Sequence, residues 1–198
     1  GGGGGGGGGG GVMIITPSPT TTPSAQPIKV LISEIQAGIP GGVNNEFVEF
    51  YNPNDQPIDL TGWSLKKKTA SGNESYLVNT GAFAGVIPAK GFFLIGHQDY
   101  AGAKPADLNY SNNSNPLAYG NNTVLLYSQT GEAVDEVNYS NIQPGESLER
   151  KALGGGSCST AQGNGEFLGN GCDTDSSSDF QTRTAPNPQN KNSLPEPR

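Results

Sequence analysis

Charged and apolar residues are both scarce in this sequence, and long runs of helix-forming residues are absent. Charged residues make up 15% and apolar residues 32% of the 198 residues. No stretch is rich enough in Ala, Leu, Glu, Lys and Arg to support a long helix, which excludes a helical bundle. Asn, Ser, Thr, Gly and Pro fill the difference, and these residues favour turns. The composition therefore indicates an all-β domain with many tight connections.

Histidine is too rare for most catalytic or zinc centres. His97 is the only histidine, so a Ser-His-Asp triad or a zinc site would have to depend on it alone. It follows the apolar residues 92–95 at the end of an expected strand, where a position in a surface loop is the simpler interpretation. No glycine-rich phosphate loop stands between a strand and a helix. The sequence predicts a protein that is not an enzyme and needs no cofactor.

Only two cysteines are present, Cys158 and Cys172, in a stretch rich in Gly, Ser and Asn. No histidine lies nearby to complete a zinc site, so a disulfide in an oxidising compartment is the favoured interpretation. Two unrelated thiols are the alternative. A disulfide closing a loop of this size would stabilise the fold by roughly 3 kcal/mol. We expect a protein located outside the cell or on its surface.

Positive charge is also in deficit, with 11 Lys and Arg against 18 Asp and Glu and a net charge of −7. Nonspecific nucleic-acid binding depends on Lys and Arg, so no nucleic-acid partner is expected. The short basic run 66–68 is more typical of a solvated strand end or of a guard against edge pairing. Outside the glycine run 1–11, the sequence has no run of 18 apolar residues. Contact with a membrane is therefore expected only through an N-terminal anchor.

Residues 1–27 form a region of their own. Residues 1–11 are all glycine, and a Thr/Pro/Ser tract of polyproline-II character, typical of surface stalks, leads to Pro27. Between them stands a short apolar segment without an evident partner in its own domain: Val12, Met13, Ile14, Ile15 and Thr16. This segment can be a strand donated to a neighbouring subunit, the end of an anchor or assembly helix, or a stub left by export processing.

The next region is rich in short strands. They are expected at Lys29–Gln36, Glu46–Tyr51, Trp63–Lys67, Ser75–Val78, Gly91–Gly96, Thr123–Ser128, Ala133–Tyr139 and Glu146–Arg150. The strands at Thr123–Ser128 and Ala133–Tyr139 form the clearest hairpin. Trp63 is expected to be the anchor of the core. Residues 151–198 are polar and are expected to form loops. Short strands at this spacing favour a sandwich or a barrel.

Several sequence segments, in the same order along the chain, resemble those of the lamin-tail domain family. They are Ile32–Ile35, Asn45–Pro53, Ile58–Lys66, Ile87–Ile95, Gly145–Arg150, and Asp179–Phe180 with Ala185–Pro188. The resemblance implies an immunoglobulin-like β-sandwich over residues 28–190, followed by a mobile tail at 191–198. The chain resembles the prokaryotic type, whose members look like modules of secreted and surface proteins. The family has no shared catalytic residues.

Two sets of polar residues suggest ligands or modification. Asp173, Asp175 and Asp179 are interspersed with hydroxyl residues and can surround a calcium ion, although the pattern departs from an EF-hand. A solvated turn in which these aspartates bond backbone amides is the favoured alternative. Sequons for N-glycosylation occur at Asn73, Asn109, Asn112, Asn121 and Asn138.

The function we expect is that of a structural subunit in a surface or filamentous assembly of identical copies, joined through residues 12–16. A monomeric adhesion or targeting module is the alternative. It would bind glycans or surface proteins through loops such as 97–122, where Tyr100, Tyr110 and Tyr119 could form an exposed cluster. An accessory domain of a secreted nuclease or phosphatase is a further alternative.

Overall fold

The computed structural model describes residues 1–7, 29–111, 117–159 and 168–196. The expected assembly segment at residues 12–16 and the sequon at Asn112 lie outside these ranges. Fourteen strands and one short 3-10 helix make up the named elements of the described part. They are β1 (Leu31–Gln36), β2 (Phe47–Tyr51), β3 (Ile58–Asp59), β4 (Ser64–Thr69), β5 (Glu74–Val78), β6 (Val86–Ile87), β7 (Phe92–His97), β8 (Leu108–Tyr110), β9 (Asn122–Tyr127), β10 (Ala133–Tyr139), β11 (Ser147–Arg150), β12 (Ala152–Gly154), β13 (Ser157–Ser159), η2 (Ser177–Asp179) and β14 (Phe180–Arg183).

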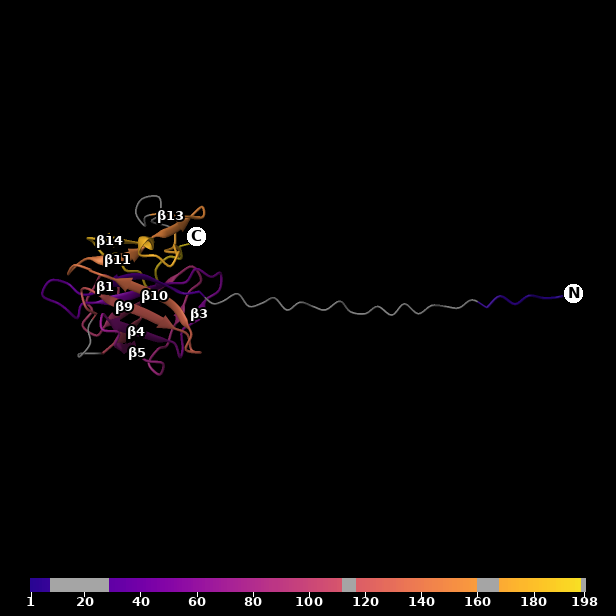
Figure 1. Cartoon of the computed structure of the whole chain (residues 1–198), viewed down its shortest axis with the longest axis horizontal. Coiled ribbons are helices and arrows are strands. Elements are labelled where there is room, and N and C mark those ends of the chain that lie inside the picture. Colours follow the sequence, from indigo (N-terminus) through magenta and orange to yellow (C-terminus); the bar gives the residue numbers. More distant parts are fainter. Residues whose placement is uncertain (8–28, 112–116, 160–167, 197–198) are drawn as a thin grey trace.

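Two sheets enclose the core. One has six strands in the order β14-β11-β1-β2-β7-β8, and the other has four in the order β10-β9-β4-β5. In Figure 1 the labels β5, β4, β9 and β10 follow one another across one layer, and β1, β11 and β14 continue in the next. Neighbouring strands are antiparallel except β7 and β8. The chain therefore folds as an immunoglobulin-like β-sandwich, as the sequence predicted.

The core lies where the inward side chains of both sheets meet. Val48, Phe50, Phe93 and Ile95 of the six-stranded sheet belong to the same buried cluster as the inward residues of β4 and β9. The expected hairpin is confirmed, because β9 and β10 pair in antiparallel register and the Ser128 N–H bonds the Glu132 carbonyl across the turn. All eight expected strands are present, with ends that differ from expectation by at most two residues.

The segment Ile58–Lys66, which resembles the family, contains a tight turn directly before Trp63. The Trp63 N–H donates to the Leu60 carbonyl at 3.1 Å, and Gly62 has φ +80°, the conformation that the third residue of a type II turn requires. Asp59 Oδ1 accepts the Thr61 N–H at 2.9 Å and fixes the start of the turn. The turn delivers Trp63, which is 3% exposed, into the core directly before β4.

Both faces of the six-stranded sheet are covered, and the C-terminal residues do much of this covering. The prediction of loops after residue 150 is wrong: β12 and β13 form a hairpin, and β14 pairs with β11. The part of the expected mobile tail that the structure describes is also anchored. The Lys191 N–H donates to Asp107 at 2.9 Å, and the Glu196 N–H donates to the Lys90 carbonyl at 2.7 Å. We call residues 184–196 the C-terminal strap.

Replacing Trp63 with Ala should lower the free energy of unfolding by about 3–5 kcal/mol, because it empties a large buried volume in the sandwich. Denaturant unfolding followed by circular dichroism measures this change. Val86→Ala is the matched control, since Val86 is 51% exposed and should lose little. A loss at Trp63 no larger than the loss at Val86 would contradict the assignment of Trp63 as the core anchor.

Candidate functional site

A groove runs beside β10 on the open edge of the four-stranded sheet. One wall is Ala133–Asn138, and residues of the Asp173–Phe180 segment and Arg150 line the rest. Its volume is about 470 Å³. Within the described part of the chain, β10 pairs only with β9, so its other edge faces this groove. Edge backbone groups can bond an added strand, which makes the groove a candidate binding site.

Arg150 is the hub of this region. Its side chain is 2% exposed and donates from three nitrogens: Nε to the Ile32 carbonyl at 2.9 Å, Nη1 to the Cys172 carbonyl at 2.9 Å and Nη2 to Asp135 at 2.7 Å. Nη1 also lies 3.1 Å from Asp173, and the guanidinium stacks 4.6 Å from the centre of the Phe180 ring. A planar donor fork suits such multiple bonding. One side chain thereby joins β1, β10, β11 and the C-terminal segment.

The Arg150–Asp135 pair also supplies hydrogen-bond partners for the backbone of β1 at an irregularity in that strand. The register between β1 and β2 shifts between Ile32 and Glu34, and a bulge of this kind disrupts the ladder locally. Asp135 Oδ2 accepts the Ile32 N–H at 2.6 Å, and Arg150 donates to the carbonyl of the same residue. Burial raises the pKa of Asp135, while Arg150 and the Ile32 N–H oppose that shift. The pair therefore supports strand β1 where its neighbours do not.

The aspartates predicted as calcium ligands have other partners. Asp179 accepts the Thr174 N–H at 2.7 Å, the Thr174 hydroxyl at 2.6 Å and the Ser176 N–H at 3.3 Å. Burial opposes these bonds, yet together they lower the pKa of Asp179. Asp173 pairs with Lys29 at 2.5 Å and with Arg150, while Asp175 is exposed. This geometry favours the alternative of a hydrogen-bonded turn, and calcium binding stays a prediction.

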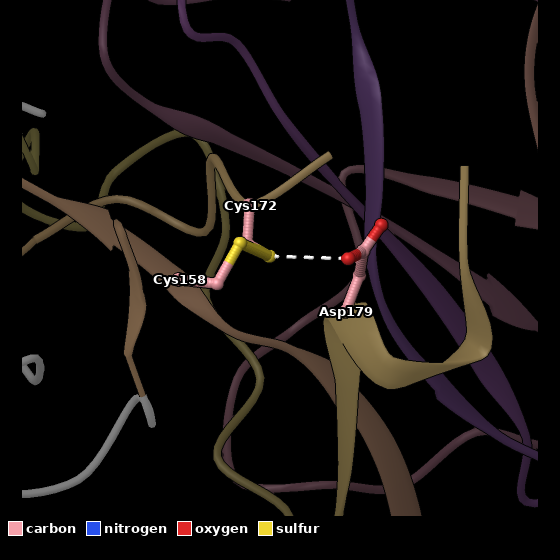
Figure 2. Close-up of side chains that lie close together, drawn as sticks. All are labelled: Cys158, Cys172 and Asp179. Carbon is pink, nitrogen blue, oxygen red and sulfur yellow. Dashed lines mark hydrogen bonds between the residues drawn. A yellow bond between two sulfur atoms is a disulfide. The ribbon is translucent and has the colours of Figure 1, made fainter. Parts of the chain in front are cut away.

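The predicted disulfide between Cys158 and Cys172 is present, with 5.2 Å between the two Cα atoms. Figure 2 shows the bridge with Asp179 Oδ1 beside the Cys172 sulfur, 3.3 Å away. Among the described residues, these three form the only group of His, Cys, Asp or Glu ligand atoms close enough to hold one metal ion. Metal ligation requires thiolates, and both sulfurs are committed to the bridge. The bridge joins the β12–β13 hairpin to the carbonyl that Arg150 binds.

Three glutamates form a row across the outer face of the six-stranded sheet. The strand register places Glu34 opposite Glu49 on one side and opposite Glu149 on the other. All three are at most 6% exposed. Burial, followed by repulsion from Glu34, raises the pKa of Glu49, and burial raises the pKa of Glu34 to about 7. Like charges on adjacent strands are unfavourable, so the row holds extra protons in the folded state.

The C-terminal strap covers this glutamate row and bonds it directly. The Gln189 N–H donates to Glu49 at 2.5 Å, and the Asn187 N–H donates to Glu34 at 3.3 Å. Ser33 and Ser147 add hydroxyl donors to Glu49 and Glu34 respectively. Arg183 pairs with Glu149 at 2.8 Å. The row is therefore a docking surface for the end of the same chain.

The remaining predicted residues do not join one site. His97 is fully buried at the end of β7, so the expectation of a surface loop is wrong for this residue. It is buried because it continues the inward face of β7, and its ring lies edge-on to Tyr110 at 5.5 Å. The four described sequon asparagines, Asn73, Asn109, Asn121 and Asn138, are all exposed. Their glycosylation stays a prediction.

Sequence reasoning missed Arg150, Asp135 and the glutamate row. Arg150 stands in a segment that resembles the family, and that resemblance assigns it no role. A usable signal was present at Glu34 and Glu49, because each interrupts an otherwise apolar strand. Such an interruption predicts a buried polar group with bonded partners. The partners themselves are more than 100 residues away for Glu34, and sequence spacing does not reveal them.

Arg150→Met should lower the free energy of unfolding by about 3–5 kcal/mol, because it leaves Asp135 buried without its cation. The double variant Arg150→Met with Asp135→Leu should recover part of this loss, since both buried charges are then removed. Chemical denaturation of the two variants and the parent measures the effect. Equal stability of the parent and Arg150→Met would contradict the role of Arg150 as a hub.

The free energy of unfolding should fall as the pH rises from about 4.5 towards 7 and beyond. The folded state keeps protons on Glu34 and Glu49 that the unfolded chain releases near pH 4.5, so raised pH favours unfolding. The slope is up to about 1.4 kcal/mol per pH unit for each retained proton. Glu34→Gln should flatten the profile, whereas Glu132→Gln, at an exposed turn residue, should not. Unfolding curves at several pH values test both variants, and an unchanged slope in Glu34→Gln contradicts the assignment.

Only part of the candidate site lies within the region that matches a known family. Residues 23–141 match the sequence model of the lamin tail domain, which is more than half of the chain. The match ends before β11, so Arg150, the disulfide and the C-terminal strap lie beyond it. No curated protein matches the chain. On the strength of the family match and the β-sandwich that accompanies it, the chain belongs to the lamin tail domain family.

Proposed function

We propose that this chain is a non-catalytic structural subunit of an extracellular or cell-surface assembly, joined to its neighbours through residues 12–16. The observation that carries this proposal is the open edge of β10 with a groove beside it. A short β-branched segment is the kind of peptide that adds to such an edge through main-chain hydrogen bonds. The acceptor is then the β10 groove of one copy, and the donor is the N-terminal segment of another.

The start of the sandwich lies next to this groove, which favours exchange between copies. Lys29 pairs with Asp173, which is itself a lining residue. Residues 17–28, extended as polyproline II at about 3.1 Å per residue, would carry the donor roughly 35 Å away. A stiff spacer of that length reaches a second copy more readily than it turns back into its own groove. Head-to-tail donation of this kind produces a filament unless the geometry closes a ring.

The disulfide supports the location outside the cell, because such bonds persist in oxidising compartments. No helix in the described ranges is long and apolar enough to cross a membrane. The adhesion alternative draws little support from its tyrosines. Tyr110 is buried in the core, and Tyr100 packs edge-on against Phe47 at 5.6 Å, so these rings form no exposed cluster.

The full chain should form filaments or discrete oligomers, and a chain starting at Ile28 should stay monomeric. Glu136→Pro in the full chain should also prevent assembly. The Glu136 N–H now donates to the Asp135 side chain at 2.9 Å; an added strand would take over this donor, and proline removes it. Light scattering and negative-stain microscopy at matched concentrations measure assembly.

Glu136→Gln is the matched control, because it keeps the N–H and should assemble like the parent. Assembly of Glu136→Pro at the parental level would exclude β10 as the acceptor edge. If the full chain remains monomeric at high concentration, the assembly proposal fails altogether.

A further inference from the structure

One end of the sandwich core is polar, although the rest is apolar. It contains Glu46, Lys67, His97, Tyr110, Asn122 and Tyr139, all at most 6% exposed. Three belong to the six-stranded side, where the His97 N–H bonds the Glu46 carbonyl at 3.1 Å and the Tyr110 hydroxyl bonds Glu46 Oε1 at 2.5 Å. The other three lie on β4, β9 and β10. We call this group the polar end of the core.

The strand register brings Lys67 and Asn122 together on the inner face of the four-stranded sheet. Lys67 lies opposite Val124, a core residue, and Asn122 is two residues from Val124 on the same face. Such diagonal neighbours are about 7–8 Å apart, a span that a long side chain crosses. On the other side of Asn122, Tyr139 is its direct partner on β10. Lys67 and Asn122 are therefore neighbouring buried residues on the inner face of this sheet.

The carboxamide of Asn122 is held on one side only. Its oxygen accepts the Thr123 N–H at 3.0 Å, whereas its buried nitrogen has no well-formed hydrogen bond among the described residues and lies beside the Tyr139 hydroxyl, where it opposes the rise in the Tyr139 pKa that burial causes. A donor on the oxygen polarises the carbonyl and would stabilise negative charge formed there. An amide nitrogen that is buried without a well-formed hydrogen bond is unfavourable as it stands.

Burial brings the pKa values of Glu46 and Lys67 closer together than those of a free Glu and a free Lys. Burial raises the pKa of Glu46 to about 7, with the Tyr110 and Leu117 hydrogen bonds and Lys67 opposing it. Burial lowers the pKa of Lys67, and Glu46 opposes that shift. Both shifts favour the uncharged amine beside the protonated acid. An uncharged amine is a nucleophile, and an acid of that pKa serves in proton transfer near neutral pH.

We propose that Lys67 and Asn122 form an intramolecular isopeptide bond, with Glu46 as the proton carrier. The neutral Lys67 Nζ attacks Cγ of Asn122, and the carbonyl oxygen takes the electron pair while bonded to the Thr123 N–H. Glu46 moves a proton from Nζ to Nδ2, the Cγ–Nδ2 bond breaks, and Nδ2 leaves as ammonia. The new amide joins Nζ to Cγ, and no oxidant, reductant or further reactant is needed.

The bond would join β4 to β9 inside the core, independently of the disulfide between Cys158 and Cys172. The polar end of the core then serves to build a covalent staple in addition to its hydrogen bonds. Its formation does not depend on the assembly proposed above, although a subunit that carries tension along a filament would gain from it. Failure of assembly and failure of the bond are separate results, since one is read from particle size and the other from mass.

The test is the intact mass of the purified full chain after reduction of its disulfide. We expect a mass lower than that of the sequence by one ammonia, and a protease digest with a branched peptide joining Lys67 to Asn122. A mass equal to that of the sequence overturns the proposal. A loss of ammonia found only in linear peptides, as in succinimide formation at an asparagine, overturns it too.

Matched variants separate the residues involved. Lys67→Arg keeps the positive charge but should restore the full mass, and Asn122→Ala should contain no branched peptide. Lys66→Arg should retain the bond, because Lys66 pairs with Glu74 on the outer face of the sheet at 3.2 Å. Glu46→Gln should slow bond formation strongly. Complete bonding in Glu46→Gln overturns the role given to Glu46, and the mass of the parent chain remains decisive if any variant fails to fold.

Discussion

The buried guanidinium of Arg150 is the interaction on which the arrangement of this sandwich most depends. It bonds a carbonyl at the β1 bulge, a carboxylate on β10 and the carbonyl of a disulfide cysteine, while its flat face packs on Phe180. Removing such a charge from water is unfavourable unless its donors are satisfied. The partners come from both sheets and from the C-terminal segment, so their positions are fixed together. The wall of the groove beside β10 is a consequence of this bonding.

The six-stranded sheet is covered on both faces, because the C-terminal strap lies over its outer face. Polar strap residues cover it, and the strap bonds a row of glutamates through backbone N–H groups. Carboxylates accept several such bonds well, which explains why acidic residues rather than apolar ones stand there. The arrangement also makes the strap sensitive to proton binding, since adjacent acids cannot all be charged without repulsion. The end of the chain is thus part of the fold and of its response to pH.

The two polar regions of the interior have different characters. Around Arg150 most buried donors and acceptors have partners, which suits a structural hub. At the polar end of the core, His97 Nε2 is buried with no partner among the described residues, and Asn122 Nδ2 has no well-formed hydrogen bond there although it lies beside the Tyr139 hydroxyl. Unpaired buried groups of this kind call for a physical explanation. A reaction that removes the Asn122 nitrogen provides one for that residue.

The sequence by itself determined the all-β class, the positions of eight strands, the hairpin before residue 140, the anchoring role of Trp63 and the pairing of the only two cysteines. These features follow from local periodicity, turn chemistry and the lack of other partners, all of which are readable along the chain. Only the tertiary structure decided that His97 is buried, that β14 completes the six-stranded sheet while the strap covers its outer face, and that Glu34, Asp135 and Arg150 have bonded partners. Those outcomes depend on contacts between residues as far as 153 positions apart. Local sequence patterns carry no information about which distant donor will meet a given buried acceptor, so the fold has to bring them together before their roles can be seen.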